Sequence, residues 1–163
     1  MKTILICWLL LATPAVAQTP SHRYPELHEE AGALVGGMTW PTETSGVGDR
    51  RDAMNRHLAM LEAHLAQIRA EVCESCGDTA IPVAPLEAAM LECRAPGQVE
   101  SALTPQEYAD AVGPSVKTMR DHLSRMSRER SPFKRQQLLW GYYRHAVHAF
   151  AQARPQCRPG SSG

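Results

Sequence analysis

The chain has 163 residues, enough for one domain with its own hydrophobic core, and it carries 17 basic and 17 acidic side chains. Loss of Lys2 with the signal peptide predicted below leaves 16 basic and 17 acidic residues, a net charge of about −1. This balance predicts neither a nucleic-acid-binding protein nor one that adheres to anionic membranes.

Residues 1–17 predict a cleavable secretory signal peptide. Lys2 precedes an apolar run over residues 4–12, and Ala15-Val16-Ala17 forms the small-x-small pattern that places the cut before Gln18. The alternative is a retained membrane anchor, but the apolar run has roughly ten residues and a membrane span needs about twenty. We therefore expect a periplasmic or secreted protein with no membrane span after cleavage.

Residues 18–48 are rich in proline and glycine, which predicts an extended or flexible leader. Pro25 and the residues after it could start one short helix within that leader.

The next segment, residues 49–74, predicts the clearest helix of the chain. Its apolar residues recur at alternating spacings of four and three: Met54, Leu58, Leu61, Leu65, Ile68 and Val72. A short helix is expected over residues 85–94, because Pro85 suits a first helical position.

Two further long helices are predicted by their start signals. Thr104, Pro105 and Glu107 form a capping box that opens a helix over residues 104–129, kinked at Gly113-Pro114. Ser131 and Pro132 open a helix over residues 132–153 in the same way.

These elements predict an all-α domain over residues 49–157 with a disordered tail at 158–163. Alternating strand patterns of useful length are lacking, so we expect essentially no sheet. The three long helices fit an up-down-up bundle, with the short helix across one end. In that topology all four cysteines after the signal peptide gather at one pole.

Those four cysteines, Cys73, Cys76, Cys93 and Cys157, predict two disulfides in an oxidising compartment. We favour Cys76–Cys93 with Cys73–Cys157, since closing the Cys76–Cys93 loop contributes about 3 kcal/mol by restricting the unfolded chain. The alternative is a local Cys73–Cys76 bridge with Cys93–Cys157.

Other chemistry for the cysteines is disfavoured. Cys73 and Cys76 are spaced like a redox pair, but they follow a helix C-terminus, where the helix dipole opposes a thiolate. Attachment of c-type haem needs a histidine where Gly77 stands. A four-cysteine zinc site has compatible local spacing but does not suit an oxidising destination.

The histidines offer a second metal hypothesis. His145 and His148 lie three residues apart, and the predicted helices also carry His57, His64 and His122. With Met54, Met60, Met119 and Met126, these side chains could bind copper. The simpler interpretation makes the methionines core residues and leaves the histidines in solvent beside the apolar stripes.

Charge and aromatic residues point to a partner. Residues 62–110 carry a net charge of −7 and residues 117–135 one of +5. Neighbouring helices could neutralise each other. Alternatively, a basic patch binds an acidic partner through Arg125, Arg128, Arg130, Lys134 and Arg135.

The aromatic residues of the last helix, Phe133, Trp140, Tyr143 and Phe150, are expected in or near the core. Trp40, in the leader, is expected to pack on the body of the domain or on a partner.

No phosphate loop, nucleophile elbow, H-E-x-x-H pair or calcium loop is recognisable, so no cofactor is expected and an enzyme is disfavoured. The leading hypothesis is an exported, non-enzymatic helical protein that recognises a protein partner, as an adaptor, inhibitor or immunity-type factor. The alternatives are a periplasmic metal-binding protein and a thiol-disulfide protein using Cys73 and Cys76.

Overall fold

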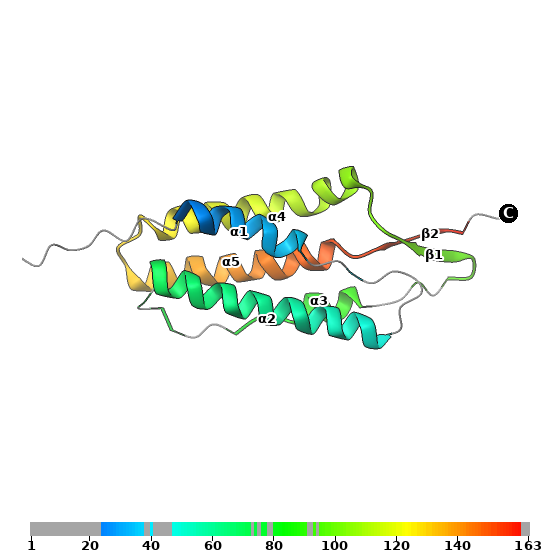
Figure 1. The fold of residues 1–163 in the computed structure, drawn as a ribbon, viewed down its shortest axis with the longest axis horizontal. Helices are drawn as coiled ribbons and strands as arrows, with labels where there is room; N and C mark the ends of the chain where they lie inside the picture. The colour runs from blue at the N-terminus through cyan, green and yellow to red at the C-terminus, as the bar shows by residue number, and fades with distance from the viewer. Residues whose placement is uncertain are drawn as a thin grey trace, which may run out of the picture.

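The protein folds as a bundle built on three long helices. The computed structural model describes residues 24–37, 40, 47–72, 74, 76–77, 80–90, 93 and 95–160. The long helices within them are α2 (Val47–Val72), α4 (Pro105–Met126) and α5 (Pro132–Gln152) (Figure 1). The shorter elements are α1 (Tyr24–Gly36), α3 (Ala84–Ala89), β1 (Gln98–Ser101) and β2 (Gln156–Pro159). The predicted mostly helical fold with a disulfide is thus confirmed. The predicted signal peptide lies outside the described residues.

The start of α4 confirms the predicted capping box. The Glu107 amide donates to Thr104 Oγ1 at 3.3 Å, and the Thr104 amide donates to Glu107 Oε2 at 2.8 Å. Arg158 in β2 also donates to both carboxylate oxygens of Glu107, at 2.6 and 2.7 Å. The Thr104 amide first, and then Arg158, lower the pKa of Glu107 to about 2. The cap therefore also ties α4 to the strand that follows α5.

As predicted, α4 continues through the proline in its interior. Helix α4 continues through Pro114 to Met126, and Thr118 Oγ1 donates to the Pro114 carbonyl at 2.9 Å. Helix α3 is shorter than the predicted 85–94, since its capping residue is already Met90.

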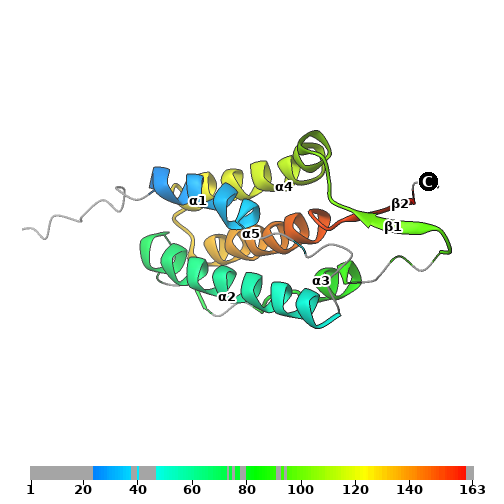
Figure 2. The same cartoon turned by 45° about the vertical axis from the view of Figure 1, so that its right-hand side comes forward.

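The directions of the long helices differ from the expected up-down-up order. His57 and His64 of α2 contact Phe150 and Tyr142 of α5, so numbering rises along α2 while it falls along α5. Helix α4 is likewise antiparallel to α5, which lies between α4 and α2 (Figures 1 and 2). Helices α2 and α4 are therefore parallel. The connection between them is long enough to return along the bundle, so alternation is not enforced.

The cysteines do not gather at one pole. Cys93 bonds to Cys157, with Cα atoms 5.5 Å apart, so the favoured Cys76–Cys93 and Cys73–Cys157 pairing is wrong and the Cys93–Cys157 bond of the alternative is confirmed. This disulfide lies at the start of α2, because Arg50 pairs with Glu100, which is opposite Cys157 in the ribbon. Cys76 follows the other end of α2. It is also disulfide-bonded, and Cys73 lies outside the described residues.

The expectation of no sheet was wrong over two short segments. Strands β1 and β2 pair antiparallel over four residues each, from Gln98↔Pro159 to Ser101↔Gln156. Strands of four residues are too short to show an alternating pattern in the sequence. The Cys93–Cys157 bond, which such a pattern cannot reveal, links β2 to the segment before β1. Arg158 and Pro159 were expected in the disordered tail, but they belong to β2.

The leader prediction was wrong over residues 24–36, which form α1, whereas the short helix expected after Pro25 is confirmed. Helix α1 buries Leu27, Ala31 and Leu34 against the bundle. Trp40 packs on the body of the domain: its indole Nε1 donates to the Phe150 carbonyl at 2.8 Å, and its ring stacks on the Phe150 ring at 4.6 Å. None of the described helices is both long and apolar enough to cross a membrane.

Two histidines expected in solvent are buried instead. His57 is 0% exposed and stacks on Phe150 with ring centroids 3.9 Å apart, while His64 is 6% exposed. Burial lowers the pKa of His57 to about 4, and the Ala146 backbone offsets this only in part. His57 is therefore neutral in the folded protein at pH 7.

The buried His57 predicts loss of stability in mild acid. Its pKa is about 6.5 when unfolded and about 4 when folded, so the unfolded state binds more protons between those values. The free energy of unfolding should fall by about 3 kcal/mol on His57's account as the pH drops from 6.5 to 4. Urea denaturation of the wild type and of His57→Gln, from pH 7 to pH 4, measures this. Parallel curves for the two proteins would contradict it.

Candidate binding surface

The outward face of α5 exposes aromatic side chains. Phe133, Gln137, Trp140, Arg144 and His148 follow one another at spacings of four, three, four and four, which places them along one side of a helix. Phe133 is 71% exposed and Trp140 is 47% exposed, so the expectation that both belong to the core was wrong. Tyr143 and Phe150 are buried as predicted. We call Phe133, Gln137, Trp140, Arg144 and His148 the α5 stripe.

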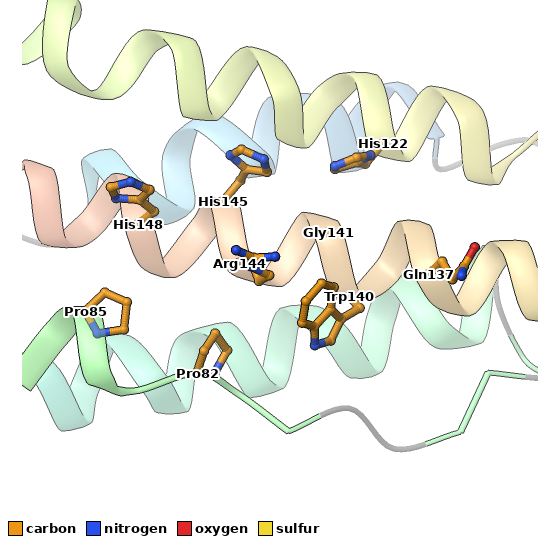
Figure 3. A pocket seen from close by; sticks show the side chains of 9 residues that line it. All are labelled: Pro82, Pro85, His122, Gln137, Trp140, Gly141, Arg144, His145 and His148. Carbon is orange, nitrogen blue, oxygen red and sulfur yellow. The ribbon is translucent and has the colours of Figure 1, made fainter.

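A cleft of about 740 Å³ runs beside the α5 stripe (Figure 3). Trp140 and Arg144 line it from α5, Pro82 lines it from the segment that leads into α3, and Pro85 lines it from the first turn of α3. The Arg144 guanidinium lies 4.6 Å from the centroid of the Trp140 ring, a cation–π contact. The cleft thus combines an aromatic surface, a cation and two rigid prolines.

Two histidines meet in the wall of this cleft. His122 extends from α4 and His145 from α5 into the space between these helices, with ring centroids 5.8 Å apart (Figure 3). Gly141 makes room for the His122 ring, because a Cβ atom at this position would lie 2.7 Å from His122 Nε2. Burial lowers the pKa of both imidazoles, and a neighbouring histidine lowers each further, His145 for His122 and His148 for His145. Both are therefore neutral at pH 7.

The five predicted metal-binding histidines thus separate into two groups. His122, His145 and the exposed His148 line the cleft, whereas His57 and His64 lie in the core. Among the described residues, no group of three or more His, Cys, Asp or Glu side chains could hold a metal ion. Met119 and Met126 are completely buried, so these two methionines are core residues. The Cys93–Cys157 bond contradicts a four-cysteine zinc site.

The predicted basic patch lies at the turn between α4 and α5. Arg125, Arg128, Arg130 and Lys134 are exposed. Arg135 is half-buried, and its Nε donates to the Glu129 carbonyl, which gives it a structural contact. We call the four exposed residues the basic turn.

The basic turn adjoins the cleft. Arg125, Lys134 and Gln137 line a second hollow of about 350 Å³, and Gln137 also lines the cleft. The acid of this turn, Glu129, is engaged by the backbone, since its Oε1 accepts from the Ser131 amide at 2.9 Å. The hydrogen bond from the Ser131 amide lowers the pKa of Glu129 most, desolvation opposes that shift, and the positive charge of Lys134 lowers the pKa further. The basic turn and the cleft form one continuous surface.

A carboxylate, an imidazole and a hydroxyl also meet inside the bundle, in the order found in catalytic relays. His64 Nδ1 lies 3.3 Å from Glu30 Oε2, and His64 Nε2 lies 2.5 Å from the Tyr142 hydroxyl. Tyr142 is 0% exposed, and burial raises its pKa far above the usual value. The hydroxyl therefore stays protonated, donates a hydrogen bond to His64 and is not accessible to a substrate. This group joins α1, α2 and α5.

Comparison of the chain with protein-family models, with curated proteins and with solved structures finds no match. Function is therefore inferred from the residues of the surface itself. Sequence reasoning missed the roles of Trp140, Arg144, Pro82 and Pro85. The available signal was the helical spacing of Phe133 and Trp140, which places both on the side of α5 away from Tyr142 and Ala146.

The Glu30–His64–Tyr142 group predicts a stability effect. Tyr142→Phe removes the hydroxyl and leaves His64 Nε2 buried without a donor, which should lower the free energy of unfolding by about 1–3 kcal/mol. The matched change Trp140→Phe, on the exposed side of the same helix, should stay within about 0.5 kcal/mol. Urea denaturation at pH 7 compares the two variants. Equal effects would show that the buried hydrogen bond does not stabilise the fold.

Proposed function

We propose that this protein is an exported, non-enzymatic binding protein, and that it holds an acidic segment of a protein partner on the surface formed by the cleft and the basic turn. The observation that carries this proposal is Trp140, a large aromatic side chain 47% exposed at the edge of a cleft of about 740 Å³. Tryptophan and arginine are the residues most often responsible for binding energy at protein interfaces. Here Trp140 and Arg144 lie in contact.

Charge supports an acidic partner. Arg125, Arg128, Arg130 and Lys134 are exposed at the basic turn, while the carboxylate of Glu129 is occupied by the start of α5. A segment with carboxylates beside an apolar side chain would meet cations at the turn and an aromatic ring in the cleft. Electrostatic complementarity of this kind raises the association rate and selects the partner.

Size supports a protein partner. Stable protein interfaces bury about 800 Å² on each side, more than a single side chain in the cleft supplies. The α5 stripe continues from Trp140 to Phe133, which is 71% exposed at the basic turn. An extended segment along α5 would contact both sites at once.

The export part of the proposal rests on the sequence of residues 1–17 and on cysteine use. Disulfides persist in oxidising compartments, and Cys76, Cys93 and Cys157 are all disulfide-bonded. An adaptor, an inhibitor and an immunity-type factor all fit a small bundle of this kind.

Charge reversal at the basic turn tests the proposal. With residues 18–163 as bait in an extract of the source organism, Arg125→Glu/Arg128→Glu/Arg130→Glu should weaken capture of the partner by about tenfold or more. Trp140→Ala should weaken it comparably without changing the charge. Cross-linking with mass spectrometry should place an acidic segment of the partner against α5.

The matched control reverses three exposed arginines elsewhere. Arg51→Glu/Arg56→Glu/Arg154→Glu changes the net charge equally but should leave capture unchanged. Equal losses of partner capture in both triple variants would show that the effect depends only on the total charge of the protein. Undiminished binding by the Arg125, Arg128 and Arg130 variant and by Trp140→Ala would refute the proposed surface.

A further inference from the structure

We propose that His122 and His145 form a copper-binding site in the wall of the cleft, between α4 and α5. This site lies in the wall of the cleft that belongs to the proposed partner surface, but it uses two imidazoles and none of the exposed side chains of the basic turn. It can therefore be tested on the purified chain alone.

The separation of the two rings suits a shared ion. Two imidazoles bound to one metal at ~2.0–2.1 Å per nitrogen place their ring centroids about 4.5–6.4 Å apart, depending on the angle between the two bonds at the metal. The centroids of His122 and His145 are 5.8 Å apart, with an angle of 46° between the ring planes. The two side chains extend from different helices toward each other (Figure 3), so no large backbone movement is needed.

The donor atoms are also available. Nδ1 of His122 and Nδ1 of His145 are both buried, and neither has a hydrogen-bond partner. A buried polar atom without a partner is costly, and a bound ion supplies one. Burial also lowers the pKa of both rings, so they are in the neutral form that binds metals.

The other histidines are less suitable. His64 is already engaged by Glu30 and Tyr142, and His57 is enclosed beneath Phe150. His148 lies three residues from His145, but it is exposed, and the described residues contain no three-ligand group.

The donor set favours copper. Imidazole suits copper, nickel and zinc, and among divalent ions Cu²⁺ binds a given set of nitrogen donors most strongly. Zinc sites in proteins offer three or four ligands, whereas this pair supplies two, and the described residues contain no larger group. Arg125 and Arg144 lie close enough to lower the pKa of His122 and His145 respectively, and they weaken binding of any cation. We therefore expect moderate affinity, with water in the remaining positions.

Titration with Cu²⁺ alone tests the site. The purified chain of residues 18–163 should bind one copper ion with an electron paramagnetic resonance spectrum of two nitrogen ligands. His122→Gln and His145→Gln should each weaken that binding by about tenfold or more, because each removes half of the protein ligands. Circular dichroism confirms that both variants keep the fold. Zn²⁺ should bind more weakly than Cu²⁺ at the same site.

His148→Gln is the matched control, since this histidine lies in the same cleft but outside the pair. Its copper affinity should equal that of the wild type. Equal losses in all three histidine variants, or undiminished binding when His122 and His145 are both replaced, would show surface binding only and overturn the proposal. Absence of copper binding would overturn it as well.

Gly141→Val supplies a test that keeps both histidines. The added side chain collides with the His122 ring and should displace it, so copper affinity should fall although no ligand is removed. If Gly141→Val unfolds the protein, the histidine variants still decide the question.

Discussion

The stack of three rings around Phe150 is the contact on which the arrangement of the helices depends. Trp40, from the segment between α1 and α2, and His57, from α2, both stack on Phe150 of α5. The indole of Trp40 also donates to the Phe150 backbone. Three parts of the chain that are far apart in sequence meet on one ring. Together with the His64–Tyr142 contact, the stack places α2 antiparallel to α5. Aromatic pairs of this geometry stabilise beyond the area that they bury.

The stack, together with His64 and Tyr142, occupies the inward side of α5 and so determines what remains for function. Leu139, Ala146 and Val147 are also buried there, and α4 covers the neighbouring side. The opposite side retains Phe133, Trp140 and Arg144, which are exposed. The packing that stabilises the domain and the surface proposed for binding are therefore two sides of one helix.

The sequence predicts the helices well because their ends are marked by local chemistry. Thr104 with Glu107 and Ser131 with Pro132 set the starts of α4 and α5. The buried face of α2 includes the predicted Leu61, Leu65 and Ile68. It extends further to His57 and His64, two histidines that an apolar pattern omits. Helix directions and cysteine pairing depend on contacts between distant residues, and a long connection allows several solutions. For the candidate site, the basic turn was predicted, but the cleft was not.

The unexpected direction of α2 accounts for the cleft. If α2 ended at the pole where α4 begins, a short connection would lead directly into α4. Because α2 instead ends at the far pole, the chain must return along the bundle, and the described residues 80–90 of that return lie beside α5. Pro82 and Pro85 come from this segment and form the wall opposite Trp140. The topology therefore supplies this wall of the cleft, and the two prolines restrict its backbone.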